Sequence, residues 1–355
     1  MSRLDRLSKL IKTDCALITS DINRRYFTGM KSSAGTVLLF KDKAYLIIDF
    51  RYIEKAKNLL AGDPFIEVVL QDKLYEQINA LISKHGAETI AVESMTVTVS
   101  QLESYKNKLS AEVVSSDDLS DSINTIRMIK TPDETEKMIQ AQRIAETGFE
   151  HMLEFIHEGV TERELQLELD YFMLNNGAEA LSFDTIALSG KNTSLPHGVP
   201  GDKKIEKGDF VLFDFGAVVD GYHSDMTRTV CVGQPSEKMK RVYDIVLKAQ
   251  LAALDAVKAG ITGRELDKIA RDIISAEGFG EQFGHSLGHG VGVEIHEPPY
   301  AAKSYDKPLP ENSIVTVEPG IYIENEFGVR IEDFVIVKND GCVNMTKAPK
   351  QLIIL

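Results

Sequence analysis

The sequence predicts an α/β protein of two domains, the second of which contains two related halves. The chain has 355 residues, more than a single hydrophobic core usually serves. Before residue 122, short apolar strands alternate with amphipathic helices. Beyond that point, a series of similar segments occurs twice, in the same order each time. We therefore expect an N-terminal α/β domain at residues 1–122 and a C-terminal domain at residues 123–355.

The N-terminal domain is predicted from runs of β-branched and aromatic residues. The expected strands are Thr36–Phe40, Ala44–Ile48, Ile66–Leu70 and Thr89–Val92, and the expected helices are Leu74–Lys84 and Ser100–Leu109. A polar loop at Ser115–Asp121 suggests the boundary. Thr131-Pro-Asp-Glu then has the features of a helix start, with threonine as the N-cap, proline in the first turn and acids behind it.

The C-terminal domain carries an internal repeat. Gly159–Leu165 and Gly260–Leu266 share a glycine followed by Thr-x-x-Glu, a capping box that starts a helix in each copy. Downstream, Gly208–Gly216 aligns with Asn312–Gly320, and each of these segments is a buried-type strand that includes one carboxylate. Matches in one order at nearly one offset predict two halves related by a pseudo-twofold axis.

Composition and charge exclude several classes of partner. The formal net charge of −14 disfavours contact with nucleic acid or an anionic membrane. No apolar run approaches the ~20 residues that a membrane span needs. The three cysteines lie far apart, and the N-terminal segment lacks the apolar core of a secretory signal. We therefore expect a cytoplasmic protein without a disulfide framework.

The first half of the repeat places two acids on a predicted hairpin. Phe210–Gly216 is an apolar strand that contains Asp214, and the chain turns back at Asp220-Gly221 to form a strand with Asp225. The two carboxylates can then share one inward face. Burying them side by side is unfavourable unless cations neutralise them. The alternative is that both acids lie on an edge strand and point to solvent.

The second half repeats the arrangement and adds histidines. Two further apolar strands carry Glu318 and Glu332, and a glycine-rich segment between the halves holds His285, His289 and His296. One neutral imidazole with four carboxylates suits a pair of divalent ions such as manganese, cobalt or zinc, and some of the acids can bridge the pair.

These motifs resemble a known family. The similarity is carried by Pro196-His-Gly, His223–Arg228, Gly288-His-Gly, Ile295–Pro299, Val317–Gly320 and Arg330–Glu332, and in the N-terminal domain by Asn23–Gly29 and Asp49–Tyr52. Together they are similar to the pita-bread metallopeptidases, and within them to the Xaa-Pro peptidases, aminopeptidase P and prolidase. The resemblance implies a creatinase-like N-terminal domain, a pita-bread C-terminal domain and a homodimer.

The resemblance also implies which residues hold metal. Asp214 would be a terminal ligand of one ion, and His289 and Glu318 would be terminal ligands of the other. Asp225 and Glu332 would bridge the two ions. Manganese or cobalt is expected, with zinc as an alternative. A hydroxide that bridges the metals would then attack the peptide bond between an N-terminal residue and a following proline.

Further residues receive roles by the same comparison. Glu318 would shuttle the proton, His296 would donate to the tetrahedral intermediate, and His197 and His285 would position substrate or relay protons. Arg330 lies two residues before Glu332 and so shares its strand face, where it can hold a ligand carboxylate or pair with an acid elsewhere. His223 is expected only as a neighbour of the site.

The remaining histidines lie outside these motifs. His85, His151 and His157 stand in predicted helical or loop segments and are expected to face solvent.

The substrate remains open between longer peptides and dipeptides. Prolidases resembling this chain tend to carry an arginine shortly after His-Glu-x-Pro, where it can hold the C-terminal carboxylate of a dipeptide. Here that position is Tyr300, which cannot provide a bidentate cation, and Lys303 offers only a point charge. This favours an Xaa-Pro aminopeptidase, with an Xaa-Pro dipeptidase as the alternative.

Three other functions share part of this pattern. A non-catalytic peptide-binding protein on the same fold would be expected to lack ligands that are complete here. Methionine aminopeptidases share the five ligands but not the N-terminal domain or the Xaa-Pro-like flanks. Creatine amidinohydrolase shares the two-domain architecture but does not need the metal ligands.

Overall fold

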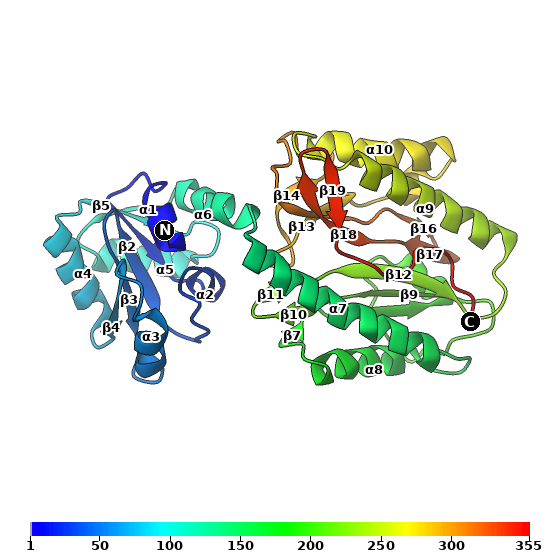
Figure 1. Ribbon diagram of the computed structural model, residues 1–355, viewed down its shortest axis with the longest axis horizontal. Helices are drawn as coiled ribbons and strands as arrows, with labels where there is room; N and C mark the ends of the chain where they lie inside the picture. The colour runs from blue at the N-terminus through cyan, green and yellow to red at the C-terminus, as the bar shows by residue number, and fades with distance from the viewer. Residues whose placement is uncertain (1) are drawn as a thin grey trace. The chain divides into compact units, whose positions relative to one another are not determined.

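The computed structural model describes residues 2–355, which divide into two compact units. The first unit ends at Arg127, and the second runs from Met128 to Leu355 (Figure 1). The predicted division after residue 122 lies inside helix α6, Asp118–Met128. Acids in the first turn of α6 and the burial of Ile123 and Ile126 favour a helix where the polar sequence suggested a loop.

The first unit is built on a six-stranded mixed sheet in the order β4-β3-β2-β1-β5-β6. Its strands are β1 Cys15–Ile18, β2 Thr36–Phe40, β3 Ala44–Ile48, β4 Ile66–Leu70, β5 Thr89–Val92 and β6 Glu112–Val114. Its helices, besides α6, are α1 Arg3–Ser8, α2 Asp21–Thr28, α3 Ile53–Leu60, α4 Leu74–His85 and α5 Val99–Lys108. The four predicted strands and the two predicted helices are confirmed. The predicted strands β2 and β3 are fully buried inside the sheet, whereas β4 forms its partly exposed edge.

The second unit has four long helices and several short sheets. The helices are α7 Pro132–Phe155, α8 Glu162–Asn175, α9 Glu237–Ala256 and α10 Gly263–Ala276, with 3-10 turns η1 Gly190–Ser194 and η2 Gly280–Gln282. The strands of its first half are β7 Ala180–Leu181, β8 Ile186–Ser189, β9 Phe210–Phe215, β10 Ala217–Val219, β11 Tyr222–His223 and β12 Met226–Cys231. The remaining strands are β13 Gly288–Gly290, β14 Glu297–Ala301, β15 Ile314–Val317, β16 Gly320–Ile323, β17 Phe327–Arg330, β18 Asp333–Lys338 and β19 Gly341–Asn344.

The helices cover two sides of the strands. In Figure 1, α7 and α8 lie on one side of the strands and α9 and α10 on the other. Helix α7 begins as predicted, because Thr131 and Glu134 form a complete capping box with proline in the first turn. Two apolar cores result, one between α7/α8 and strands β9 and β12, the other between α9/α10 and strands β15, β17 and β18.

The predicted repeat is visible in the backbone hydrogen bonds. Thr161 caps α8 and Thr262 caps α10, each with a complete capping box. Thr161 also bridges Lys204, and Thr262 bridges Pro308 in the same antiparallel manner. The glycine two residues before each threonine donates its amide N–H to the loop beside that bridge. The two halves therefore repeat local structure as well as sequence.

Each half contributes a hairpin whose strand pairing changes along its length. In the first half β9 pairs with β12 near the base and β10 with β11 near the tip, while in the second half β15 pairs with β18 and β16 with β17. Gly216 lies at the first change, where an added Cβ would stand 2.0 Å from the Ser224 carbonyl oxygen. The predicted carboxylates lie at or beside these changes. None of the helices among residues 2–355 is long and apolar enough to cross a membrane.

Candidate metal centre

All of the site residues predicted from the sequence line one cavity of about 530 Å³ in the second unit. They are Asp214, Asp225, His289, Glu318 and Glu332, together with His197, His285, His296 and Arg330. Apolar side chains such as Phe183, Ile186 and Ile295 complete the wall. A cavity with an apolar lining and convergent polar groups is typical of a small-ligand site.

The two hairpins bring the four acids into this cavity. Asp214 lies within β9 opposite Thr227 of β12, and Asp225 precedes Thr227 by two residues, so the strand period places both acids on one face. Glu318 directly follows β15, and Glu332 directly precedes β18. The solvent-facing alternative is excluded for Asp225 and Glu332, which are 3% and 1% exposed.

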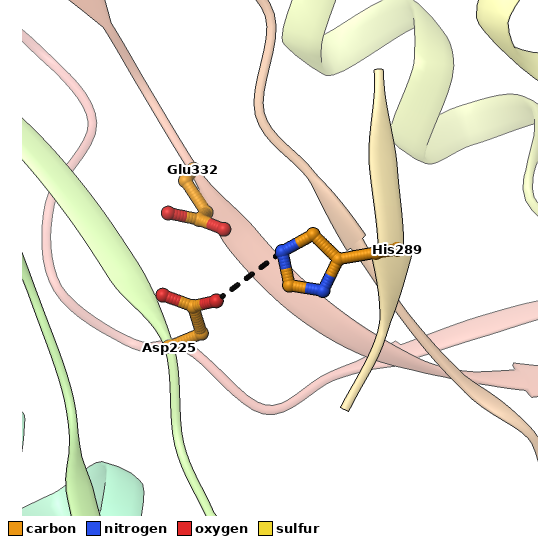
Figure 2. A group of neighbouring side chains, drawn as sticks. All are labelled: Asp225, His289 and Glu332. Carbon is orange, nitrogen blue, oxygen red and sulfur yellow. Dashed lines mark ion pairs between the residues drawn. The ribbon is translucent and has the colours of Figure 1, made fainter. Parts of the chain in front are cut away.

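His289 faces the acids from strand β13. Ligand atoms of Asp225, His289 and Glu332 all lie within 4.8 Å of one another, and Figure 2 shows the imidazole pointing toward both carboxylates. The Nε2 atom of His289 is 3.6 Å from Asp225 Oδ2 and 3.3 Å from Glu318 Oε1. Its Nδ1–H donates to the carbonyl of Gly290 at 3.1 Å. This hydrogen bond leaves the Nε2 lone pair directed at the acids.

The electrostatics of the cavity favour a cation. Burial, reinforced by the charges of Asp214 and Glu318, raises the pKa of Asp225 well above its ordinary value. Burial and the charge of Asp225 do the same to the pKa of Glu332, and burial raises the pKa of Glu318 to about 8. Burial also lowers the pKa of His289 to about 4, so the imidazole is neutral at pH 7. Divalent ions would relieve the repulsion among these carboxylates.

The donor set therefore fits divalent metal. Within the described chain, the buried Oδ1 atom of Asp214 has no hydrogen-bond partner, so it has an acceptor left for a cation. Four carboxylates and one neutral imidazole are ligands that manganese, cobalt and zinc accept.

Arg330 contacts an acid of the site, as predicted. From β17, its Nη2 donates to Asp214 Oδ2 at 2.5 Å and its Nη1 donates to the Tyr322 hydroxyl at 2.7 Å. Its Nε donates to Thr227 Oγ1 at 3.0 Å, and Thr227 in turn donates to Glu332 Oε2 at 2.7 Å. Arg330 and Thr227 thus link a carboxylate of one hairpin to a carboxylate of the other.

Tyr322 and Thr227 were not identified from the sequence. Tyr322 lies four residues after Glu318, and Thr227 lies two residues after Asp225. An even separation on a strand places side chains on one face, so this spacing was the available signal.

The other cavity histidines have distinct surroundings. His285 Nδ1 donates to the Ser286 carbonyl at 2.8 Å, so its Nε2 accepts from the Tyr322 hydroxyl at 2.8 Å. Burial lowers the pKa of His285 to about 4. His296 packs edge-on against His289 with 4.3 Å between ring centroids, and burial lowers its pKa as well. His197 lies exposed at the cavity wall.

The structure corrects two predictions about the remaining histidines. His85 stacks on Phe40 at 4.0 Å, and its side chain is only 16% exposed. His151 stacks on Phe172 at 4.4 Å and contacts the Glu168 carboxylate. Both were expected to face solvent, but an aromatic neighbour covers one face of each ring. His157 is exposed as predicted.

His223 stands outside the group of acids. Its Nδ1 lies 2.9 Å from Ser182 Oγ, and His223 is not among the described residues that line the cavity.

Comparison with known proteins identifies the family. Residues 136–339 match the profile of metallopeptidase family M24, and residues 1–129 match the creatinase/prolidase N-terminal domain. The chain belongs to metallopeptidase family M24. It is 40% identical to an Xaa-Pro dipeptidase of Pyrococcus furiosus over 98% of this chain and 99% of that one.

Solved structures agree with this assignment. An Xaa-Pro dipeptidase from Bacillus anthracis is 43% identical, with a TM-score of 0.95 over 99% of each chain. An X-Pro aminopeptidase from Thermotoga maritima is 38% identical, with a TM-score of 0.90 over 99% of this chain and 100% of that one. The predicted creatinase-like N-terminal domain and pita-bread C-terminal domain of this M24 enzyme are thereby confirmed.

Proposed function

We propose that this M24 enzyme hydrolyses the bond between an N-terminal residue and a following proline. The observation that carries the proposal is the convergence of four acids and His289 in one cavity, in a chain of a metallopeptidase family. The names of the relatives support the Xaa-Pro preference, because they describe Xaa-Pro dipeptidases and an X-Pro aminopeptidase.

We infer that two divalent ions are bound by Asp214, Asp225, His289, Glu318 and Glu332. The close approach of ligand atoms from Asp225, His289 and Glu332 and the mutual repulsion of the acids support this ligand set. When bound, such ions supply an activated water and polarise the substrate carbonyl. Manganese or cobalt suits these ligands, and zinc is the alternative.

The protein side chains would orient the peptide and move protons. Glu318 accepts a hydrogen bond from Thr316 Oγ1 at 3.0 Å and stands in the cavity wall, where it can carry a proton to the departing proline nitrogen. His296, His285 and His197 line the same cavity and can donate to the peptide. Arg330 holds the Asp214 carboxylate in place.

Longer peptides suit this cavity better than dipeptides. Among the described residues that line it, Arg330 is the only arginine or lysine, and Asp214 already engages it. Tyr300 lies opposite His289 in the pairing of β13 with β14, where its ring offers no charge for a dipeptide carboxylate. We therefore propose an Xaa-Pro aminopeptidase. The dipeptidase alternative is supported by the names of the two relatives with higher identity.

A comparison of substrates tests the proposal. Hydrolysis rates on an Xaa-Pro dipeptide, an Xaa-Pro-Yaa tripeptide and a proline-free tripeptide are measured with manganese, cobalt and zinc in turn. We expect the Xaa-Pro-Yaa tripeptide to be cleaved fastest. A strong preference for the dipeptide would support the prolidase alternative. Tight binding without hydrolysis under any metal would instead identify a peptide-binding protein. The homodimer and the cytoplasmic location stay predictions, of which sedimentation tests the first.

A further inference from the structure

We propose that Glu162, a residue outside the cavity, positions His197 for the reaction. The inference rests on the proposed function, in which His197 contacts the substrate. Glu162 is the first residue of helix α8 and is 0% exposed. Its carboxylate organises the loop that brings His197 to the cavity wall.

The contacts of Glu162 hold both ends of this loop. Its Oε1 accepts from the Ser189 amide at 2.7 Å, from Ser189 Oγ at 3.2 Å and from Asn192 Nδ2 at 3.0 Å. Its Oε2 accepts from Asn192 Nδ2 at 3.2 Å and from the Gly201 amide at 3.2 Å. Ser189 precedes His197 and Gly201 follows it, so one buried carboxylate closes the loop across its base. Closing a loop in this way lowers the conformational freedom of everything between the ends.

The middle of the loop is held by a local turn, in which the Gly198 amide donates to the Leu195 carbonyl at 3.1 Å. Leu195 and Val199 flank the histidine and are 54% and 81% exposed. The first turn of the loop is fixed at Thr193, whose hydroxyl donates to the Gly190 carbonyl and accepts from the Gly328 amide at 2.8 Å. After this turn, Glu162 next contacts the loop at Gly201. His197 therefore lies between two anchors. Glu162 shares the second one with Arg163, whose backbone amide donates to the Gly201 carbonyl at 3.0 Å and whose Nη2 donates to the Pro200 carbonyl at 3.1 Å.

The repeat shows that α8 does not need Glu162 to start. Thr161 and Glu164 satisfy the helix start, exactly as Thr262 and Glu265 do for α10. The position equivalent to Glu162 in the second half is Gly263, where an added Cβ would lie 1.9 Å from the Tyr300 carbonyl oxygen. At matched positions, one half has room only for glycine and the other has a buried carboxylate directed at a loop.

A buried acceptor with several donors is sensitive to a change of one atom. Replacing Glu162 with glutamine keeps its size but sets an NH₂ group against N–H donors that need an acceptor. The affected donors belong to the loop, whereas the capping box and the metal ligands keep their partners. We expect the loop to loosen while the five metal ligands stay in place.

The test compares Glu162→Gln with the control Glu164→Gln. Glu164 lies in the same helix start, and its carboxylate accepts hydrogen bonds from the capping residue Thr161. Hydrogen exchange of the amides between residues 190 and 201 is measured together with metal content. In Glu162→Gln we expect exchange at least ten times faster and unchanged metal content. In Glu164→Gln we expect neither value to change. Unchanged exchange in Glu162→Gln would overturn the inference, and this readout does not depend on activity.

A double-mutant cycle links the loop to the reaction. Alone, Glu162→Gln should lower kcat/KM on an Xaa-Pro peptide about tenfold, and in a His197→Ala background it should lower it by less than twofold. Equal losses in both backgrounds would show that Glu162 does not act through His197. If the wild-type protein cleaves no Xaa-Pro peptide, the proposed function fails while the exchange result still stands. Should Glu162→Gln not fold, Asn192→Ala removes one donor from the loop side and should change exchange and kcat/KM in the same direction.

Discussion

Removing divalent metal should make the stability of the second unit depend on pH. In the metal-free protein, burial raises the pKa of Glu318 to about 8, and burial with nearby charge also raises the pKa of Asp225 and of Glu332. In the unfolded chain these groups ionise near their ordinary values. The folded protein then holds more protons at neutral pH, so its free energy of unfolding falls as pH rises toward the folded pKa.

The informative range begins above pH ~6.5, where histidines in the unfolded chain are neutral. Burial lowers the pKa of His285 and His289 to about 4. Their contribution to the free energy of unfolding therefore rises with pH between about 4 and about 6.5, and it is nearly constant above that range. Between pH 6.5 and 8, a range of about 1.5 pH units, Glu318 lowers the free energy of unfolding by about 1.4 kcal/mol per unit, on the order of 2 kcal/mol in all. For a domain of about 150–250 residues this lowers Tm by about 4–8 °C.

Thermal unfolding followed by circular dichroism between pH 6.5 and 8 measures this effect. With a chelator, Tm should fall across the range. With manganese the fall should shrink, because the metal keeps the carboxylates ionised in the folded state. The variant Glu318→Gln removes one titrating group and should flatten the curve obtained with chelator. A metal-free Tm that stays constant or rises over this range would refute the reasoning.

Three further predictions follow from particular contacts. Arg228 is 1% exposed and donates to the buried Asp333 and to the carbonyls of Pro349 and Ala348, so Arg228→Met should lower the free energy of unfolding by about 1–3 kcal/mol in a urea titration. Lys350 Nζ stays 2.6 Å from Asp333, so the loss should not reach that of an unpaired buried charge. Tyr300→Arg should raise the dipeptide-to-tripeptide ratio of kcat/KM about tenfold, because it adds a bidentate cation at the cavity wall; an unchanged ratio would contradict the Tyr300 argument. Burial raises the pKa of Cys15 to about 12 and that of Cys231 to about 11, so mass spectrometry should find neither thiol alkylated at pH 8 unless the protein is unfolded.

Much of the site could be predicted because its chemistry is encoded locally. Asp214 lies in β9 and Asp225 directly precedes the adjacent strand β12, and a strand period of two is enough to place them on one face. The repeat predicts a second pair of acids in the other half, since Glu318 occupies the position that matches Asp214. Four of the six strands of the first unit were also predicted, because they are short apolar runs rich in β-branched and aromatic residues. Strands β1 and β6 were not predicted.

The remaining features depend on contacts that are distant in sequence. Tyr322 hydrogen-bonds to His285 only after two separate segments have packed, and Glu162 reaches Gly201 across a long loop. The prediction that His85 faces solvent was wrong because Phe40, which covers its ring, lies on strand β2 and His85 lies on helix α4. Spacing along the chain carries little information about such pairs, so they emerge only from the packed structure.

We propose that five side chains hold two divalent ions that this enzyme needs for cleaving Xaa-Pro bonds. The most direct test is to count manganese ions per chain by elemental analysis in the wild type and in Asp225→Asn, while following hydrolysis of an Xaa-Pro-Yaa tripeptide. We expect two ions and hydrolysis in the wild type, and loss of both in the variant. Full metal content with full activity in Asp225→Asn would show that Asp225 is not a metal ligand that the reaction needs.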